Sequence, residues 1–227
     1  MHRLGPLYQT HLSLKATFGH VSTWQVAQTV SQESVELKAA REGVGLSDLS
    51  DRAKVMVEGA QSSELLHQAL AVPELAINSG AAVADDIYVY RLRRDRFYVS
   101  GPTGEEGAIT SILKAARASV NGLVTVTNET NGRAEMLLAG PESATCLSRI
   151  CGLDFYEGEF PNHAAKQSSV AKTRQLIMRR DIDGLPAYYL SGGRSFAAYL
   201  WNIILEAGQD LAIRPIGRNA ITQLGYK

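Results

Sequence analysis

Apolar and polar positions along this chain follow two different periods. Runs rich in β-branched and aromatic residues have the length and partial alternation typical of strands, and they include DIYVYRL, DRFYVSG, KTRQLIMRR and LPAYYLS. Segments 98–116 and 189–207 each begin as such a strand and continue, after a Ser-Gly turn, with apolar residues at helical spacing. A further helix is expected over residues 31–43, with Gly43 at its C-terminal end.

The chain also resembles itself at long range. RAKVMVEGAQSSELLHQ (52–68) aligns with RAEMLLAGPESATCLSR (133–149) at an offset of 81, and each reads as a strand, a Gly turn and a helix. YVSGPTGEEGAITSILKAA (98–116) aligns with YLSGGRSFAAYLWNIILEA (189–207) at an offset of 91. Chance similarity is the alternative, because the shared residue types are common in turns and helices. Two matches in the same order favour a duplication.

The growing offset predicts ten extra residues in the second copy, which we place in the polar stretch YEGEFPNHAAKQSS. With several strands between the paired blocks, each half contains a strand, a helix, further strands and a helix. This order predicts mixed antiparallel sheets with helices packed against them, an α+β fold rather than a parallel βαβ one.

Composition narrows the class of protein. The 227 residues are 45% hydrophobic and 20% charged, which is enough to bury a core, and 23 basic residues balance 23 acidic ones. A neutral chain has no overall attraction for nucleic acid or for an anionic membrane. No apolar run has the length of a membrane span, and the opening MHRLGPLYQTHL lacks the apolar core of a signal peptide, so we expect a cytoplasmic protein.

The cysteines and histidines of the sequence give little support for a metal site or for redox chemistry. Cys146 and Cys151 lie five residues apart in an expected helix, where they point in different directions, so we interpret them as buried thiols. The histidines show no zinc-type spacing among themselves or with the cysteines, and we expect no metal site.

Two short motifs allow a functional and a simpler reading. GPTGEEG (101–107) looks like a phosphate loop, but its spacing fits neither nucleotide motif, and a capping box with Thr103 as N-cap and Glu106 at the third helical position explains it more simply. RLRRDR (91–96) is either an anion patch or, more simply, a charged hairpin turn.

Trp24 is either a core residue or an aromatic in a pocket wall.

Asp85 and Asp86 stand at the start of the aromatic run IYVYRL. Asp is disfavoured in strands, and neighbouring side chains of a strand point to opposite faces, so at most one of the two carboxylates is expected to face a pocket. The simpler interpretation is that both open a strand as turn residues.

Five stretches together resemble the aminomethyltransferase (T-protein) family of folate-dependent one-carbon transfer proteins. They are GPLYQTHLSLKATFGHVSTWQ, EGVGLSDLSDRAKVMVEG, NSGAAVADDIYVYRL, MLLAGPESA and LWNIILEAGQDLAIRPIGRNAI, in the family's order and spacing. The resemblance implies a single folate-binding domain over residues 1–227, built from two duplicated strand-helix-three-strand-helix halves, about 44–120 and 121–227, after an N-terminal segment 1–43. This agrees with the internal repeat.

The resemblance also implies site residues and partners. Asp86 matches the family's Asp near N10 of tetrahydrofolate and is the expected catalytic residue, while Asp85, Tyr88, Trp24 and Tyr189 are expected to contact the cofactor. The implied activity is transfer of a one-carbon unit from a small methylated or aminomethyl donor, or demethylation of that donor. A carboxylate at Asp86 would orient the folate amine and stabilise positive charge that develops on the transferred carbon.

Several positions depart from the family. Tyr189 stands where a Glu usually contacts the pterin, Ile221 where an Arg is usual, and Pro102 where an Asn is usual. The chain also ends near the point where full-length members continue into a C-terminal β-barrel. These departures imply a partner protein or a homo-oligomer that completes the pocket. They leave open a non-catalytic folate-binding or scaffold subunit, or a module for another planar ligand.

Overall fold

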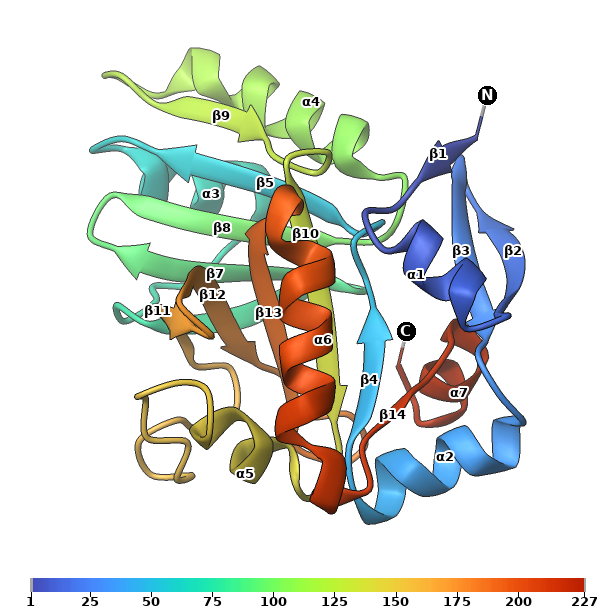
Figure 1. Ribbon diagram of the computed structural model, residues 1–227. Helices are drawn as coiled ribbons and strands as arrows, with labels where there is room; N and C mark the ends of the chain where they lie inside the picture. The colour runs from blue at the N-terminus through green and yellow to red at the C-terminus, as the bar shows by residue number, and fades with distance from the viewer. Residues whose placement is uncertain (1, 227) are drawn as a thin grey trace.

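The computed structural model describes residues 2–226 and contains three β-sheets with helices on their outer faces (Figure 1). The α+β fold expected from the sequence is therefore confirmed. Five strands form one sheet in the order β6-β7-β8-β5-β9, and the helices α3 and α4 pack on it. The bounds are Ala53–Glu58 (β5), Ser79–Ala84 (β6), Ile87–Arg93 (β7), Arg96–Gly101 (β8), Thr125–Asn128 (β9), Ser62–Leu70 (α3) and Glu106–Ala116 (α4).

Six strands form the second sheet in the order β11-β12-β13-β10-β4-β14, and the helices α5 and α6 pack on it. The bounds are Gly45–Asp48 (β4), Arg133–Ala139 (β10), Ala165–Val170 (β11), Thr173–Arg179 (β12), Ala187–Gly193 (β13), Arg214–Pro215 (β14), Ser143–Ser148 (α5) and Ala197–Ala207 (α6). Short 3₁₀ turns cover Arg117–Ser119, Arg194–Phe196 and Gln209–Leu211.

The remaining elements lie toward the right of Figure 1 and close that side of the molecule. The third sheet has the order β1-β3-β2, and α7 packs against β3 and α2. The bounds are Arg3–Leu4 (β1), Thr17–Val21 (β2), Trp24–Thr29 (β3), Tyr8–Ser13 (α1), Glu33–Glu42 (α2) and Arg218–Gln223 (α7). The helix α2 ends at Gly43, as the sequence predicts.

The two large sheets share their order and their register. In each, a first strand pairs with the strand before the second helix, and Ala53 pairs with Gly101 in one sheet as Ala134 pairs with Gly192 in the other. The turn glycine is also repeated. Gly59 and Gly140 have φ angles of 138° and 134°, and a Cβ atom on either would lie within 2.3 Å of a backbone oxygen. Only glycine fits such a turn, which explains why a glycine stands at the equivalent position after β5 and after β10.

Alternation along the strands sorts side chains into three core layers. Val55, Val57 and Val99 face the helices α3 and α4, whereas Met56 and Tyr98 point the other way, toward the second sheet. In the second sheet Met136 and Leu138 face α5 and α6, whereas Leu137 and Ala139 face the first sheet. Polar residues at inward-facing positions of the strands are therefore enclosed between the two sheets.

The extra length of the second half is not confined to the stretch that we expected. Residues 149–164 connect α5 to β11, where residues 71–78 connect α3 to β6. Residues 180–186 connect β12 to β13, where only residues 94–95 connect β7 to β8. The repeat offset therefore grows in two places. The second place was missed because its Asp-Gly pair, between the expected strands KTRQLIMRR and LPAYYLS, looks like an ordinary short hairpin turn.

Two local predictions are wrong. Thr103 and Glu106 do not form a capping box, because Thr103 donates a hydrogen bond to Asp51 and Glu106 accepts one from Arg3, and α4 begins without a side-chain cap. Both side chains therefore bond to residues that are distant in the sequence instead of to the first turn of α4. Cys151 lies beyond the end of α5 rather than inside it, although both thiols are buried as expected. The hairpin at RLRRDR is confirmed, with its turn at residues 94–95.

Among residues 2–226 the structure contains no helix that is long and apolar enough to cross a membrane. The same residues bring together no group of three or more His, Cys, Asp and Glu side chains suited to a metal ion.

Candidate functional site

Asp85 and Asp86 form the turn between β6 and β7 rather than the first positions of a strand. Asp86 has a φ of 54°, a left-handed conformation that Asp and Asn tolerate better than most residues. The prediction that the two side chains point to opposite faces of a strand was therefore made on the wrong element. In this turn Asp85 is exposed and Asp86 is partly buried.

Arg52 holds Asp86 in place. Its Nη1 donates a hydrogen bond of 2.7 Å to Asp86 Oδ2, and its Nη2 donates one of 3.1 Å to the backbone oxygen of the same residue. Arg52 is 1% exposed and Asp86 side chain 15%, so the pair is largely shielded from water. Because the guanidinium donates hydrogen bonds to both the side chain and the backbone of Asp86, it fixes the turn and the carboxylate together.

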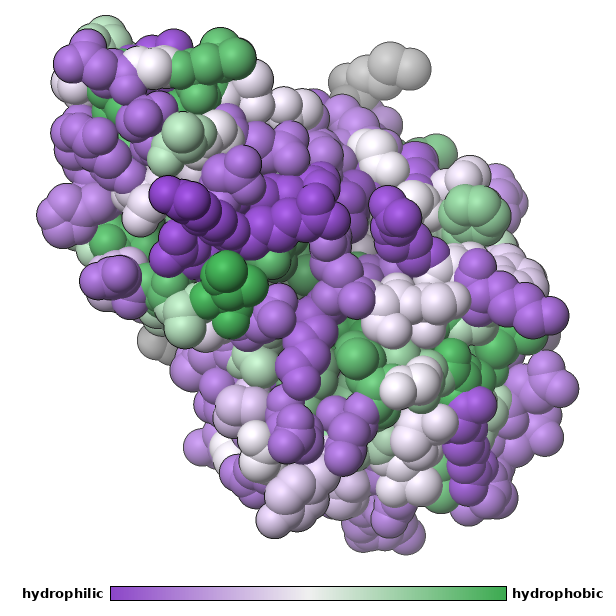
Figure 2. Space-filling view, turned by 90° about the vertical axis from the view of Figure 1, so that its left-hand side faces the viewer, coloured by the Kyte–Doolittle hydropathy of each residue, from purple (hydrophilic) through white to green (hydrophobic). Residues whose placement is uncertain are grey.

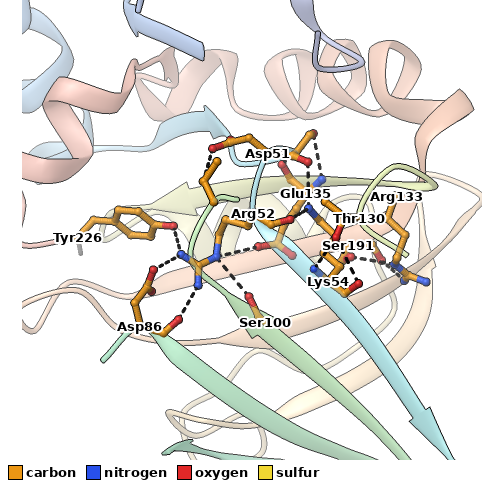
Figure 3. Close-up of polar contacts among 12 residues, drawn as sticks. Asp51, Arg52, Lys54, Asp86, Ser100, Thr130, Arg133, Glu135, Ser191 and Tyr226 are labelled. Carbon is orange, nitrogen blue, oxygen red and sulfur yellow. Dashed lines mark hydrogen bonds and ion pairs between the residues drawn. The ribbon is translucent and has the colours of Figure 1, made fainter. Parts of the chain in front are cut away.

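Arg52 is itself anchored on three sides (Figure 3). Its Nη1 donates to Tyr226 Oη at 2.7 Å, its Nε donates to Ser100 Oγ at 3.3 Å, and its Nε lies 3.9 Å from Glu135 Oε1. Burial alone would lower the pKa of Arg52, but Tyr226, Asp86 and Glu135 together raise it well above its ordinary value. Arg52 therefore stays charged inside the protein.

A second group of polar residues lies on the side of Arg52 that faces away from Asp86 (Figure 3). Glu135 is fully buried and accepts a hydrogen bond of 3.1 Å from Tyr98 Oη. Lys54 is also fully buried and donates to the backbone oxygens of Ser50 and Arg52. Burial lowers the pKa of Lys54, although the nearby Glu135 opposes this shift. These charges occupy inward-facing strand positions between the two sheets.

The Asp86 turn forms part of the wall of a cavity of about 300 Å³, which we call the Asp86 cavity. This volume is at the lower end of the range of small-molecule sites. Its wall comes from β6, β7, the connection between β12 and β13, β13 and the C-terminal residues. The lining residues are Ala82, Ala84, Asp85, Asp86, Tyr88, Arg180, Asp181, Ile182, Asp183, Tyr189, Gly225 and Tyr226.

Two tyrosines from different sheets and one arginine form an aromatic and cationic stack in this wall. The Cζ atom of Arg180 lies 4.0 Å from the centroid of the Tyr88 ring and 4.1 Å from the centroid of the Tyr189 ring. Arg180 is 6% exposed and Tyr189 is 1% exposed. Neither Arg180 Nη2 nor Tyr189 Oη makes a hydrogen bond of normal geometry with any residue in 2–226. The wall thus contains buried polar atoms whose hydrogen-bonding capacity is unused.

Four of the five residues expected at the site line this cavity, namely Asp85, Asp86, Tyr88 and Tyr189. Trp24 does not. It is buried in the small N-terminal sheet, with Arg3 over its ring, and lines a separate space of about 20 Å³, which is room for little more than one water. Whether the four residues contact a cofactor stays a prediction. Ile221 is a buried core residue, and Pro102 is not in the wall of the Asp86 cavity.

Sequence reasoning missed Arg52, Arg180 and Tyr226. Arg52 did carry a signal, since it is one of the residues shared by the two repeats, and its counterpart Arg133 donates a hydrogen bond from Nε to Ser191 Oγ as Arg52 does to Ser100. Arg180 follows the last residue of β12, in a connection to β13 that is longer than the one between β7 and β8. Tyr226 lies far from both in the sequence and gave no signal.

A basic groove occupies another face of the molecule. Arg93, Arg96, Lys172 and Arg174, from hairpins in both halves, line an open space of about 470 Å³. Figure 2 shows strongly hydrophilic residues across the middle of the face that looks left in Figure 1. Arg96 pairs with Glu58 at 3.0 Å. The segment RLRRDR is thus a hairpin turn that also contributes cations to this groove.

The two sheets, their outer helices and the open Asp86 cavity define an α+β domain with a cavity lined from both of its halves. The profile of the GCVT N-terminal domain family matches residues 7–226, nearly the whole chain. The chain belongs to the GCVT N-terminal domain family.

Individual relatives are distant. An aminomethyltransferase from Saccharopolyspora erythraea is 25% identical over 228 residues, which cover 95% of this chain and 60% of that protein. The glycine cleavage system aminomethyltransferase T from Bartonella henselae has the same fold, with a TM-score of 0.82 and 23% identity over 99% of this chain and 62% of that one. A chain of the heterotetrameric sarcosine oxidase from Corynebacterium sp. U-96 matches with a TM-score of 0.73 and 18% identity, over 94% of this chain and 98% of that one. The chain thus spans about 60% of the length of the aminomethyltransferases that it matches.

Proposed function

We propose that this domain binds tetrahydrofolate in the Asp86 cavity and takes part in transferring a one-carbon unit between that cofactor and a small methylated or aminomethyl donor. The observation that carries the proposal is the fixed position of Asp86. Arg52 holds its carboxylate at the wall of a cavity large enough for a small ligand. Membership of the family supports the choice of cofactor.

The residues of the cavity fit a folate ring. A pterin is flat and carries both hydrogen-bond donors and acceptors at its edge. Tyr88 is half-buried and offers aromatic surface at the wall, and the unpartnered atoms Arg180 Nη2 and Tyr189 Oη offer hydrogen-bonding capacity that a bound ring would satisfy. Buried polar atoms that lack a partner are rare in folded proteins and favour a ligand that supplies one.

In this proposal each residue has a separate task. Tetrahydrofolate supplies the nitrogen that accepts or releases the one-carbon unit. Asp86 accepts a hydrogen bond from the cofactor amine and stabilises positive charge that develops near the transferred carbon. Arg52 positions Asp86 and neither needs to move nor to exchange a proton. Glu135 and Ser100 hold Arg52, so the carboxylate is oriented before the ligand binds.

We also infer that the two halves of the domain, about residues 44–120 and 121–227, arose by duplication. The shared strand order, the equal pairing of Ala53 with Gly101 and of Ala134 with Gly192, and the repeated turn glycines support this inference. The cavity takes lining residues from both halves, with Tyr88 from the first and Tyr189 from the second.

A partner protein or a second copy of the chain is proposed to complete the site. The Asp86 cavity is open to solvent, which leaves room for another chain to cover it. The matched chain of the heterotetrameric sarcosine oxidase is covered over 98% of its length, so a domain of this extent occurs within an assembly of several chains.

Titration with tetrahydrofolate under anaerobic conditions tests the binding half of the proposal. Turnover, measured with whatever protein co-purifies, tests the catalytic half. Saturable binding without turnover in the presence of the partner would favour a non-catalytic folate-binding subunit. Absence of binding would overturn the proposal and favour a module for another planar ligand.

A further inference from the structure

Arg180 is the only cation among the residues that line the Asp86 cavity, and four aspartates, Asp85, Asp86, Asp181 and Asp183, share that wall with it. Its guanidinium lies over the rings of Tyr88 and Tyr189, and its Nη2 has no hydrogen-bond partner in residues 2–226. A guanidinium only donates hydrogen bonds. The part of the wall around Arg180 therefore lacks a hydrogen-bond acceptor.

We propose that Arg180 determines ligand specificity by donating a hydrogen bond to the ring carbonyl oxygen of the bound pterin. This inference rests on the proposed function, since it concerns the same ligand in the same cavity. The Glu that the T-protein family usually has at the position of Tyr189 would accept hydrogen bonds from the ring. Here the unpartnered groups are an arginine, which donates, and a tyrosine hydroxyl, which does either.

A carboxylate of the folate tail is the other acceptor that a guanidinium could bind. Charge in the cavity argues against it. Asp86 and Asp181 are paired with Arg52 and Arg179, but the four aspartates together with these two partners and Arg180 still carry a net negative charge, which would repel an anionic tail that entered as far as Arg180. A ring carbonyl carries no net charge and meets no such repulsion. Arg180 is also 6% exposed and stacked on two aromatic rings, which suits the edge of a flat, neutral heterocycle better than a flexible, hydrated carboxylate.

The position of Arg180 in the sequence explains why the family pattern did not predict it. It opens the connection 180–186, which has no counterpart of equal length between β7 and β8. Asp181 pairs with Arg179 through hydrogen bonds of 2.9 and 3.0 Å, and this pair holds the start of the connection beside the end of β12. Arg180 Nα also donates to the backbone oxygen of Ala187 at 2.9 Å. The backbone that carries Arg180 is thus fixed.

Three related ligands test the proposal on the unaltered chain. Tetrahydrofolate has the ring carbonyl, tetrahydroaminopterin has an amino group in its place, and tetrahydropteroate keeps the carbonyl but lacks the glutamate tail. A site that hydrogen-bonds a carbonyl loses at least about tenfold in affinity when a donor replaces it, because two donors then face each other. We expect tetrahydroaminopterin to bind at least about tenfold more weakly than tetrahydrofolate, and tetrahydropteroate to bind within about threefold of it.

The variant Arg180→Met assigns this preference to the residue. It removes the donor but keeps a long side chain between the tyrosine rings, and we expect it to reduce the preference for the carbonyl ligand to about threefold or less. Arg174→Met is the matched control, because Arg174 is exposed and lines the basic groove instead, and it should leave the preference unchanged. Thermal unfolding followed by circular dichroism establishes that each variant is folded.

Several results would overturn the proposal. Equal or tighter binding of tetrahydroaminopterin to the unaltered chain would do so, and so would a preference that survives in folded Arg180→Met. If the effect of Arg180→Met disappears with tetrahydropteroate, Arg180 binds the tail instead. Tetrahydrofolate binding without discrimination refutes this inference alone, whereas absence of tetrahydrofolate binding refutes the proposed function with it.

Discussion

Arg52 Nη1 lies 2.7 Å from Asp86 Oδ2, and Arg52 Nη2 lies 3.1 Å from the backbone oxygen of Asp86. The two residues are 34 positions apart in the sequence. Arg52 stands just before β5, in the interior between the sheets, whereas Asp86 stands in the β6–β7 turn at the edge of the cavity. This contact connects the buried charged layer to the proposed site.

Arg52→Lys should weaken the site more than its repeat counterpart Arg133→Lys. Lysine keeps the charge but lacks the planar guanidinium that donates hydrogen bonds to the side chain and the backbone of Asp86 at the same time. We expect Arg52→Lys to lower turnover by about tenfold or more, the effect of misplacing a charged group, and Arg133→Lys to change it by less than about threefold. Arg133 bonds Ser191 and Glu129 and does not contact Asp86. Equal effects in the two folded variants would show that Arg52 has no special relation to the site.

The buried charges of Lys54 and Glu135 should depend on each other. Glu135→Gln leaves Lys54 buried with a weaker compensating charge, so we expect it to lower the free energy of unfolding by about 3 kcal/mol. The double variant Lys54→Met and Glu135→Gln removes both charges and should recover at least about 1 kcal/mol of that loss. Urea unfolding measures both.

Glu129→Gln is the control for these variants. Glu129 pairs with Arg133 at 3.1 Å but is 26% exposed, so its loss should cost less than about 1 kcal/mol. If the double variant is as unstable as the sum of its two single variants, Lys54 and Glu135 do not interact.

The repeated turn glycine gives a test of the fold. A Cβ atom at Gly59 would lie 2.2 Å from the backbone oxygen of Leu123, at a φ of 138°, so Gly59→Ala should lower the free energy of unfolding by more than about 2 kcal/mol. Gly107→Ala lies in α4 with no atom within 4 Å of the new methyl group, and it should stabilise the chain by up to about 1 kcal/mol. Thermal melts compare the two. A neutral Gly59→Ala would mean that the turn relaxes without strain.

Much of this fold could be predicted because its signals are local. The helix that ends at Gly43, the hairpin at residues 94–95 and the strand-turn-helix units around Gly59 and Gly140 each follow from residues close in the sequence. The capping box failed because Thr103 and Glu106 bind Asp51 and Arg3, which are distant in the sequence. A local sequence pattern does not show that residues distant in the sequence compete for the same side chain.

The site was only partly predictable for a similar reason. Asp85, Asp86, Tyr88 and Tyr189 were expected from the family pattern, and the structure brings them to one cavity. Arg52, Arg180 and Tyr226 reach the same region from other elements, and their roles depend on how the two sheets face each other. Trp24 carried no signal that distinguished a core residue from a pocket residue, and it lies in another part of the fold.

Asp86→Asn should reduce turnover far more than it reduces binding. Asparagine keeps the volume and tolerates the φ of 54° at this position, but the negative charge is lost. We expect a loss in rate of about 10²- to 10⁴-fold, typical of a positioned acid-base or electrostatic group. Asp85→Asn, at the neighbouring exposed position, should have a milder effect. One-carbon transfer in the presence of the co-purifying protein measures both variants, and equal losses would indicate a structural role for the pair.

The central claim is that the Asp86 cavity binds tetrahydrofolate, and anaerobic calorimetric titration of four chains, the unaltered one and three variants, tests it most directly. The unaltered chain should bind the cofactor saturably with one site, and Asp86→Asn should bind within about threefold of it, because most of its hydrogen-bonding capacity is kept. Ala82→Trp should bind at least about tenfold more weakly, since Ala82 lines the cavity and an indole there fills a large part of its volume. Ala108→Trp, on the exposed side of α4, should bind as the unaltered chain does. Absence of binding to the unaltered chain, or undiminished binding to Ala82→Trp, would contradict the account.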